Sequence, residues 1–452
     1  MGDLARIFKA YDVRGVVPDE LDTEIAEAVG AAFAEVTGAA SIVVGRDMRA
    51  SSEPLAAAFA RGATARGAGV LDIGLASTDL LYYASGSLGR PGVMFTASHN
   101  PARYNGMKLC GPGAVPISEN TGLTEIRDRA AELIADGGPR PGPVTGEVVV
   151  KDLLPGYAGH LRTLVDLSAM RQLSVVVDAG NGMAGHTVPA VFDGLPVKLT
   201  RLYFELDGSF PNHEANPIEP ANLLDLRKAV VEHGADIGLA YDGDADRCWV
   251  VDELGESVSP STVTALVAAR ELAKHPGSKI IHNLITSAAV PEIVREHGGV
   301  PVRTRVGHSF IKAEMARTGA IFGGEHSAHY YFRDFWYADS GMLAALHVLA
   351  ALGAQDRPLS QVVARYARHV ASGEINSTVA DQRAAVERVR SAFDGREGVT
   401  FDELDGLTVT GDGWWFNLRP SNTEPLLRLN AEAADERKMA EVREEVLALV
   451  RR

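Results

Sequence analysis

Residues 41–74, SIVVGRDMRASSEPLAAAFARGATARGAGVLDIG, have the pattern of a strand, a helix and a second strand in succession. SIVVGRD (41–47) and VLDIG (70–74) are rich in β-branched and apolar residues, whereas EPLAAAFARGATARG (53–67) is rich in alanine, the strongest helix former. A further strand-like run follows in GVMFTAS (92–98). This alternation is typical of βαβ units in a layered α/β domain with a parallel or mixed sheet.

The same alternation restarts twice further along the chain, after ADGGPRPGPVTG and again after GESVSP. The C-terminal part instead favours antiparallel strands, in GEINSTV, GLTVTG, GWWFNLRPS and PLLRLNAEA, with helices before and after them. We therefore expect three similar mixed-sheet α/β domains plus a C-terminal α+β domain around a central cleft. The expected domain ranges are 1–140, 150–254, 255–366 and 370–452.

The bulk composition narrows the class of protein. With 46% hydrophobic and 23% charged residues, the 452-residue chain has the composition of a soluble globular protein. A net charge of −15 argues against nucleic acid or a membrane surface as partner. The N-terminal stretch MGDLARIFKAYDVRG lacks the apolar region of a signal peptide and no long apolar run is present, so we expect neither a signal peptide nor a membrane span. Only Cys110 and Cys248 are present, so we expect no disulfide framework and a cytoplasmic location.

Ser98 lies in MFTASHNPARYNGMK (94–108), directly after a buried-strand pattern. A serine beside a histidine suggests a nucleophile, but the flanks, Thr96-Ala97 and His99-Asn100, lack the glycines of a hydrolase G-x-S-x-G elbow. The alternative is a polar loop that caps a strand end. Polar side chains crowd at this carboxyl end of a strand, where α/β folds bind ligands: Thr96, Ser98, His99, Asn100, Tyr104, Asn105 and Lys108.

The stretch YDGDADRCWVV (241–251) places Asp242, Asp244 and Asp246 at every second position. On the extended segment that we expect here, these carboxylates would repel one another unless a cation lay between them, and hard oxygen ligands suit Mg²⁺. An EF-hand is excluded because Arg247 stands where its loop requires glycine. An ordinary acidic turn remains the alternative, although Arg247 adds a cation that can pair with phosphate.

The stretch GGEHSAHYYF (323–332) follows a strand-like run and contains Glu325, Ser327 and His329. The spacing is not the zinc-binding H-E-x-x-H pattern. Glu325 and Ser327 could hydrogen-bond neighbouring hydroxyl groups of a ligand, since alternate side chains of an extended segment point the same way. His329, or His308 in RVGHSFIK, could act as a general acid or base, although a lone histidine is usually structural.

The stretch RPSNTEP (419–425) supplies a guanidinium group, two hydroxyls and an amide within one turn, from Arg419, Ser421, Asn422 and Thr423. Such a turn can hold a phosphate through side-chain and backbone donors. Taken alone, it is more simply interpreted as a polar turn between two strands.

A formal dinucleotide fingerprint, G-x-G-x-x-G, follows a strand pattern at Gly180, Gly182 and Gly185. Glu205 even lies near the position expected for the ribose-binding acid. No second cofactor signature accompanies these residues, so a structural loop is favoured over an NAD site. No Walker A motif is present.

Together, the four polar stretches fit phosphoryl transfer, which needs a divalent cation, arginines and a nucleophilic hydroxyl. The sequence resembles the α-D-phosphohexomutase superfamily along its full length, through TASHNP (96–101), DGDADR (242–247), GEHSAH (324–329), RPSNTEP (419–425), KAYDVRG (9–15) and YNGMK (104–108). A phosphatase that uses the same acidic triplet and a non-catalytic sugar-phosphate-binding protein are the alternatives.

The resemblance implies a role for each matching residue. Ser98 would be a phosphoserine that exchanges its phosphoryl group with the substrate, and its phosphate would help Asp242, Asp244 and Asp246 to hold Mg²⁺. His99 would donate a hydrogen bond to that phosphate. The other residues around the reacting oxygens would be Arg14, Lys108, Arg247, His308 and His329. Glu325 and Ser327 would bind sugar hydroxyls, and the non-reacting phosphate would contact Arg419, Ser421, Asn422 and Thr423.

The same resemblance implies hexose phosphate substrates, a hexose 1,6-bisphosphate intermediate and activator, and a monomer or small homo-oligomer. The loop GEHSAHYYFRDF is most similar to that of bacterial phosphomannomutases, which supply GDP-mannose synthesis. Use of glucose phosphates is the alternative, since one hydroxyl is weakly discriminated, and phosphoglucosamine is less favoured. Ile285 stands where many relatives have lysine, and Lys312 is a candidate to replace that charge.

Overall fold

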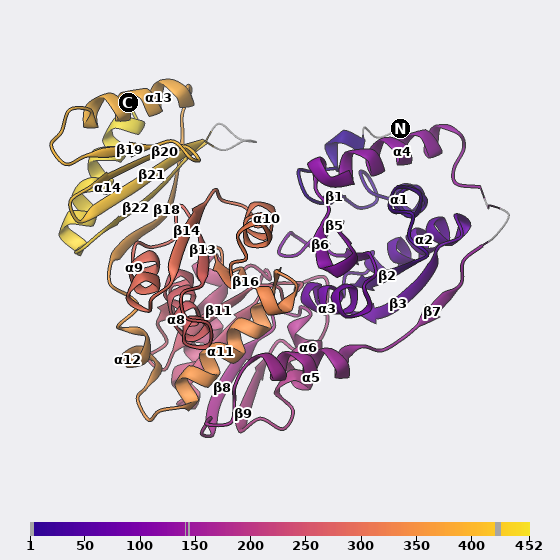
Figure 1. Cartoon of the computed structure of the whole chain (residues 1–452), viewed down its shortest axis with the longest axis horizontal. Coiled ribbons are helices and arrows are strands. Elements are labelled where there is room, and N and C mark those ends of the chain that lie inside the picture. Colours follow the sequence, from indigo (N-terminus) through magenta and orange to yellow (C-terminus); the bar gives the residue numbers. More distant parts are fainter. Residues whose placement is uncertain (1–3, 141, 143–144, 421–425) are drawn as a thin grey trace. The chain divides into compact units, whose positions relative to one another are not determined.

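The protein is described by a computed structural model that covers residues 4–140, 142, 145–420 and 426–452 (Figure 1). The described chain forms two compact units, and each is treated by itself. Unit 1 comprises Met1–Val258 and Ser327–Val362, and unit 2 comprises Ser259–His326 and Val363–Arg452. The domain ranges expected from the sequence stay a prediction, because this division is coarser.

The first sheet of unit 1 has the strand order β1-β5-β4-β2-β3-β7, with β6 paired to β5. Strands β2, β3, β4 and β7 run parallel and β1 and β5 run antiparallel to their neighbours, so the sheet is mixed as expected. The strands are β1 Val13–Val16, β2 Ser41–Arg46, β3 Gly69–Leu75, β4 Gly92–Phe95, β5 Tyr104–Gly111, β6 Val115–Pro116 and β7 Val148–Val150.

Helices cover both faces of this sheet. The helices are α1 Thr23–Thr37, α2 Ser52–Ala65, α3 Thr78–Leu88 and α4 Thr124–Ala135. Ile42 and Val44 of β2 belong to one buried core with side chains from α1, α2 and α4, whereas Val43 between them is buried outside that core. Helix α3 contacts β2 and β4. Because alternate side chains of a strand point to opposite faces, the sheet has an apolar layer on each face, as in an α/β/α sandwich.

Helices α1 and α2 cross in close contact because glycines face the crossing. A Cβ atom on Gly62 would lie 1.8 Å from the carbonyl oxygen of Glu27, and one on Gly30 would lie 2.1 Å from that of Phe59. The alanine-rich composition of both helices therefore reflects backbone proximity as well as helix propensity.

The second sheet of unit 1 has the order β12-β11-β10-β8-β9. Its strands are β8 Leu173–Asp178, β9 Val197–Leu202, β10 Ile237–Tyr241, β11 Cys248–Asp252 and β12 Ser257–Val258, and its helices are α5 Leu154–Leu164, α6 Ala184–Phe192 and α7 Leu224–His233. The expectation of one extended segment through the acidic triplet is wrong: β10 and β11 are antiparallel, and the triplet occupies the turn between them. Unit 1 also holds β16 Tyr330–Phe332, β17 Ala338–Asp339, α11 Gly341–Gly353 and the start of α12 Leu359–Val363.

Unit 2 begins with three parallel strands in the order β14-β13-β15, accompanied by three helices. These elements are α8 Pro260–Lys274, β13 Lys279–Asn283, α9 Ala289–Glu296, β14 Val300–Thr304, α10 His308–Thr318 and β15 Phe322–Gly324. The C-terminal part is a fully antiparallel sheet, β18-β22-β21-β20-β19, packed on two helices, which confirms the expected α+β domain. Its elements are β18 Val370–Thr378, α13 Gln382–Phe393, β19 Thr400–Asp402, β20 Leu407–Gly411, β21 Trp414–Pro420, β22 Leu426–Ala433 and α14 Glu436–Val450.

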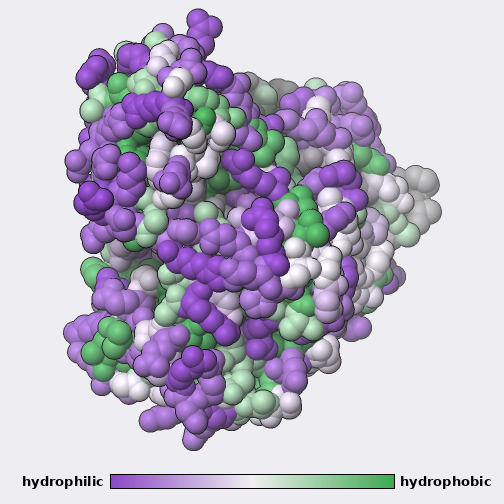
Figure 2. All heavy atoms as spheres, turned by 60° about the vertical axis from the view of Figure 1, so that its left-hand side comes forward, coloured by the Kyte–Doolittle hydropathy of each residue, from purple (hydrophilic) through white to green (hydrophobic). Residues whose placement is uncertain are grey.

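On the face shown in Figure 2, hydrophilic residues predominate and hydrophobic ones form small scattered groups. Among the helices in the described part of the chain, none has both the length and the apolar composition to cross a bilayer.

The close helix crossing predicts a contrast between two glycine-to-alanine substitutions. Gly62→Ala should lower the free energy of unfolding of unit 1 by about 1–3 kcal/mol, because the added methyl group meets backbone that cannot move aside. Gly159→Ala in α5 is the matched control: its added methyl group would have no neighbour within 4 Å, so it should stabilise by up to about 1 kcal/mol. Thermal unfolding followed by circular dichroism measures both, and equal midpoints for the two variants would contradict the packing argument.

Candidate active site

Ser98 stands in the first turn after β4, where the chain leaves the first sheet. Its backbone is in the left-handed region, with φ of 49°, and its side chain is buried. The Ser98 amide donates a hydrogen bond of 2.9 Å to the Thr96 hydroxyl, which helps to stabilise this turn. A non-glycine residue in this region is strained, and such strain persists where surrounding contacts hold it.

Arg49 supplies those contacts. Its guanidinium group, which is buried, donates hydrogen bonds of 2.7–3.0 Å to four carbonyl oxygens of the Ser98 loop, those of Ser98, Asn100, Pro101 and Tyr104. Its Nε atom donates to Asp47 at 3.2 Å, and the ring of Phe210 lies 5.1 Å from the guanidinium carbon. Arg49 was not identified from the sequence, because nothing about a single basic residue after a strand indicates that it contacts a loop some fifty positions further along the chain.

The hydroxyl of Ser98 is oriented by three side chains. It donates to Asp242 Oδ2 at 2.7 Å, Arg247 Nη2 lies 3.3 Å away as a donor, and His99 Nδ1 lies 3.2 Å away. The same Arg247 nitrogen contacts His99 Nδ1, and because arginine can only donate, this His99 nitrogen carries no proton. Because this nitrogen already accepts from Arg247 and lies 3.2 Å from Ser98, whereas Asp242 lies at 2.7 Å, the hydrogen of Ser98 is directed at Asp242 and His99 is not the base of a Ser-His pair.

The pKa of His99 supports this conclusion. Burial lowers the pKa of His99 to about 2, and the cations of Arg247 and Arg14 add to the effect. The imidazole is therefore neutral at physiological pH. Its remaining nitrogen, Nε2, carries the proton and is available as a hydrogen-bond donor.

The acidic triplet forms a compact, buried cluster at the β10–β11 turn. Asp242, Asp244 and Asp246 are almost completely excluded from solvent, and one oxygen of each lies within 4.8 Å of the others. Ala245 adopts a left-handed conformation, with φ of 59°, so the turn brings together carboxylates that an extended strand would spread apart. The three carboxylates therefore lie close together, as a shared cation would require, but they do so on a turn and not on the extended segment that we expected from the sequence.

Cations and a hydroxyl balance the triplet. Lys108 Nζ lies 2.6 Å from both Asp244 Oδ2 and Asp246 Oδ2, and Arg247 Nη2 lies 2.8 Å from Asp242. Thr78 donates its hydroxyl to Asp244 at 2.6 Å and its amide to the Asp244 carbonyl at 3.0 Å. Thr78 was not identified as a site residue, because the pattern S-T-D before an apolar run indicates a helix N-terminus. The structure shows that Thr78 is indeed the first residue of α3.

These contacts shift the pKa values in different directions. Burial raises the pKa of Asp242 more than Arg247 lowers it, whereas Lys108 and Thr78 outweigh burial and hold the pKa of Asp244 below its ordinary value. Burial and the neighbouring Asp244 raise the pKa of Asp246. Burial would lower the pKa of Lys108, but the carboxylates raise it well above its ordinary value, so Lys108 is a cation here.

The triplet fits a hard divalent cation. The buried Oδ1 atoms of Asp244 and Asp246 have no hydrogen-bond partner among the described residues, which is costly unless a cation or water meets them. Carboxylate oxygens at this separation are the donor set that Mg²⁺ and similar ions prefer.

Close backbone approaches explain the glycines around the triplet. A Cβ atom on Gly243 would lie 2.5 Å from the carbonyl oxygen of Ser98, so glycine lets the two loops meet. A Cβ atom on Gly182 would lie 2.8 Å from the Gly243 oxygen, and one on Gly185 would lie 2.3 Å from that of Phe204. The formal dinucleotide fingerprint therefore serves chain packing, as the structural interpretation expected.

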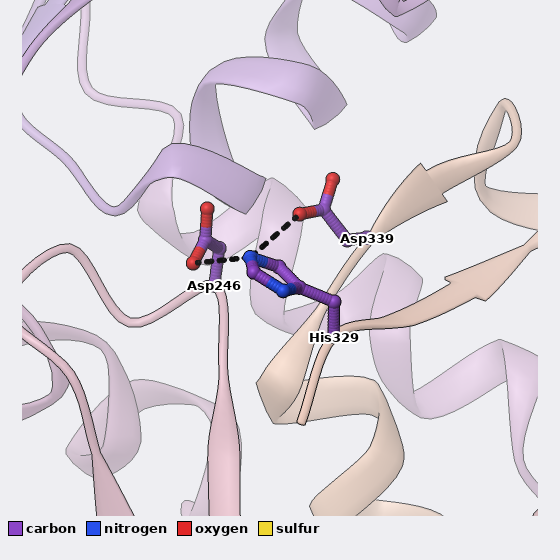
Figure 3. A group of neighbouring side chains, drawn as sticks. All are labelled: Asp246, His329 and Asp339. Carbon is purple, nitrogen blue, oxygen red and sulfur yellow. Dashed lines mark ion pairs between the residues drawn. The ribbon is translucent and has the colours of Figure 1, made fainter. Parts of the chain in front are cut away.

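His329 joins the same cluster from the hairpin segment of unit 1. Its Nε2 atom lies 3.8 Å from Asp246 and 4.0 Å from Asp339, and the three side chains converge in Figure 3. Ser327 Oγ lies 3.1 Å from Nδ1 of the same ring, and the backbones of Arg247 and His329 pair in an isolated bridge. Asp339 was missed, because an acid before the cap of α11 shows no distinctive spacing in the sequence.

Asp79 forms hydrogen bonds with the elements that carry Thr78 and Asp339. Its buried carboxylate accepts hydrogen bonds of 2.5 Å from Ser77, and of 2.6 Å from Tyr157 and from Ser340. Burial raises the pKa of Asp79 to about 6. The carboxylate thereby joins α3, α5 and the start of α11 next to the acidic cluster.

Arg14 lies on the N-terminal strand of the first sheet. It donates to Asn100 at 2.7 Å and to Asp12 at 2.6 Å, so β1 is attached to the Ser98 loop. The structure thus brings together within unit 1 the predicted residues Arg14, Ser98, His99, Lys108, Asp242, Asp244, Asp246, Arg247, Ser327 and His329.

Glu325 and Arg419 belong to unit 2. The buried Glu325 accepts hydrogen bonds from Asn283 Nδ2 at 3.2 Å and from the Gly307 amide at 3.3 Å. Arg419 lies 3.6 Å from Asp405, and burial together with Arg419 lowers the pKa of His326 to about 3. Asn283 therefore orients a predicted sugar-binding carboxylate, and sequence analysis did not identify it.

Some predicted residues lie beyond what the structure describes. Ser421, Asn422 and Thr423 are outside the described residues, and so is the side chain of His308, whose backbone begins α10. Ile285 and Lys312 are both buried.

Comparisons with known proteins agree across the whole chain. Family models described as phosphoglucomutase/phosphomannomutase alpha/beta/alpha domains I, II and III and C-terminal domain match residues 5–135, 155–255, 260–369 and 374–449. A protein named "Phosphohexose mutases" from Xanthomonas campestris pv. campestris is 43% identical over 447 residues, covering 98% of this chain and 99% of its own. A phosphomannomutase of Escherichia coli K12 is 42% identical over 447 residues, covering 97% of each.

A solved structure shows the same architecture. A phosphoglucomutase/phosphomannomutase family protein from Burkholderia thailandensis superimposes with a TM-score of 0.87 at 32% identity, covering 100% of this chain and 98% of its own. The family models and the named relatives make this chain an enzyme of the isomerase class that moves phosphoryl groups on hexoses. The chain belongs to the phosphoglucomutase/phosphomannomutase family, which confirms the resemblance inferred from its motifs.

The contacts of Arg49 predict that its shape matters as well as its charge. Arg49→Lys should lower turnover by about tenfold to a hundredfold, because an ammonium group cannot reach four carbonyl oxygens and the Ser98 loop loses its geometry. Arg61→Lys, at an exposed position, is the control and should be unaffected. Steady-state assays of both purified variants measure the effect, and unchanged turnover in Arg49→Lys would rule out this positioning role.

Proposed function

We propose that this protein is a phosphomannomutase that interconverts mannose 6-phosphate and mannose 1-phosphate through a phosphoserine enzyme and a hexose 1,6-bisphosphate intermediate. The observation that carries the proposal is the Ser98 hydroxyl, buried, strained and held between Asp242 and Arg247. Relatives named phosphomannomutase, about two-fifths identical over nearly the whole chain, support the choice of substrate. The product would supply GDP-mannose synthesis.

In the proposed reaction, a substrate hydroxyl oxygen attacks the phosphorus atom carried by Ser98. A new O–P bond forms as the Ser98 Oγ–P bond breaks, and the developing charge faces Arg247, Lys108 and Arg14. The attacking hydroxyl gives up its proton to a general base, and the serine oxygen takes up one proton as it leaves, so the proton count is unchanged. The bisphosphate intermediate would turn around within the site and transfer its other phosphoryl group to the same serine. The enzyme would therefore end the cycle with one phosphoserine, as it began.

His329 is the favoured proton acceptor among the described side chains. Lys108 is held as a cation by Asp244 and Asp246, and His99 is neutral with its Nδ1 occupied. His329 instead lies between Asp246 and Asp339, whose negative charge stabilises an imidazolium ion formed by proton transfer. His308 remains a second proposed participant.

We propose that Mg²⁺ is the resident cation, held by Asp242, Asp244 and Asp246 together with the phosphate on Ser98. It would supply positive charge to the phosphoryl oxygens when bound. Thr78 and Arg247 keep two of these carboxylates in place, which is the contribution of the chain itself.

The remaining contacts would select the substrate. Glu325 and Ser327 would bind sugar hydroxyls, and the RPSNTEP stretch, with Arg419, Ser421, Asn422 and Thr423, would hold the non-reacting phosphate. Asn283 would keep Glu325 in place. Glucose phosphates are the second candidate substrates, because glucose differs from mannose at one hydroxyl. Position 285 is a buried isoleucine here, so it lacks the positive charge of the lysine that many relatives have there. We also propose a cytoplasmic location, supported by a chain with only two cysteines, which are not joined in a disulfide.

Replacing the nucleophile tests the proposal. With Mg²⁺ and a hexose 1,6-bisphosphate, the wild-type protein should interconvert the mannose phosphates, and Ser98→Ala should lose at least about a thousandfold of that activity. Ser168→Ala, at an exposed position, is the matched control. Coupled assays with mannose 1-phosphate and glucose 1-phosphate measure both activity and preference. An active Ser98→Ala enzyme would exclude the phosphoserine mechanism, and net release of phosphate in excess of isomerisation would indicate a phosphatase.

Neutralising one carboxylate tests the cation site. Asp244→Asn should bind Mn²⁺, used as a probe for Mg²⁺, at least about tenfold more weakly and lose most turnover, because the cluster loses one formal charge. Asp128→Asn is the control, since its side chain is exposed. Isothermal titration calorimetry measures binding, and full activity of the wild type in EDTA would contradict the metal assignment.

A further inference from the structure

Strand β7 ends the first sheet with an exposed apolar edge. It pairs with β3 on one side, and no other described strand pairs with it. All three of its residues are valines with half or more of their surface exposed: Val148 at 51%, Val149 at 54% and Val150 at 75%. Figure 1 shows β7 beside β3 at the margin of this sheet. Natural edge strands are protected by proline, by a bulge, by inward-pointing charges or by being very short; of these, the strand Val148–Val150 has only its short length, and its valines stay exposed.

The backbone of β7 has a definite outward side. Val70 donates its amide to the Glu147 carbonyl at 2.8 Å, and Lys151 donates its amide to the Asp72 carbonyl at 2.9 Å. In a parallel ladder, alternate residues of a strand face the same neighbour. The odd-numbered residues therefore bond to β3, and the amides and carbonyls of Val148 and Val150 point away from it.

The side chains alternate between the two faces of the strand. Glu147, Val149 and Lys151 all line one hollow of about 390 Å³, together with Leu88 and Arg90. Glu147 and Lys151 are exposed. The strand thus presents a row in which an acid, a valine and a base follow one another on one face, with unpaired backbone groups between them.

This pattern is complementary to itself. We propose that β7 pairs antiparallel with β7 of a second copy of this chain, with Val149 opposite Val149 at a twofold axis. Val148 and Val150 then form hydrogen-bonded pairs with Val150 and Val148 of the other copy, which satisfies their outward backbone groups. Glu147 lies opposite Lys151 of the second copy, and this charge pair occurs twice.

The register also suits the side chains. In an antiparallel ladder, the positions between hydrogen-bonded pairs bring side chains closest together. In the proposed register these are the Val149–Val149 contact and both Glu147–Lys151 contacts. The odd-numbered side chains of both copies share one face, so the two hollows beside Leu88 become continuous. A three-residue strand buries little area, so the dimer should be weak and should depend on concentration and salt.

Charge exchange tests this arrangement. Sedimentation equilibrium of the full-length protein, from low micromolar to its highest soluble concentration, should show a reversible dimer. Glu147→Lys should raise the dimer dissociation constant by at least about tenfold, because both charge pairs become repulsive. The double exchange, Glu147→Lys with Lys151→Glu, restores both pairs and should return the constant to within about threefold of wild type.

A backbone variant tests the strand pairing separately. Val148→Pro removes an amide that faces away from β3, which an edge strand tolerates, and should abolish the dimer while leaving the midpoint of thermal unfolding of the monomer unchanged. A protein that stays monomeric at every concentration would overturn the proposal. So would a dimer that persists in both Glu147→Lys and Val148→Pro, because its interface would then lie elsewhere.

Discussion

Three buried carboxylates within 4.8 Å of one another are the constraint around which unit 1 is arranged. Isolated ionised carboxylates in such a place would be very costly, so each needs a cation or a donor. Lys108 comes from the first sheet, Arg247 from the turn itself, and Thr78 from the start of α3. Neutralising the triplet therefore brings together segments that are far apart in the sequence, and those segments carry the proposed chemistry.

The position of Ser98 follows from the same arrangement. Its hydroxyl is a donor to Asp242, and its strained backbone is held by the buried Arg49. Gly243 allows the carboxylate turn to approach the Ser98 carbonyl so closely that any side chain would collide with it. Arg247 places a buried cation 3.3 Å from this hydroxyl, and fixed positive charge next to the reacting oxygen favours phosphoryl transfer.

Many of the candidate residues could be predicted because they lie in short contiguous motifs. Ser98, the acidic triplet and Glu325 were identified from short stretches in which polar residues follow apolar strands. Arg49 and Asn283 could not be found this way, because each forms hydrogen bonds with a residue distant in sequence. Asp339 contacts the nearby His329, but an acid before the cap of α11 shows no distinctive spacing in the sequence. The extended geometry expected at Asp242 was wrong for a related reason: alternating acids occur in strands and in tight turns, and only the left-handed Ala245 distinguishes them.

The amino-acid sequence by itself determined the layered α/β architecture, the antiparallel C-terminal sheet and the family, because periodicity and motif spacing are local properties. The tertiary structure decided which of the polar residues touch. It showed that the proton of Ser98 is directed at Asp242 and not at His99, since that depends on where Arg247 lies. It also assigned the glycines of the apparent dinucleotide fingerprint to close chain packing, because steric room is a property of neighbours in space and not of neighbours along the chain.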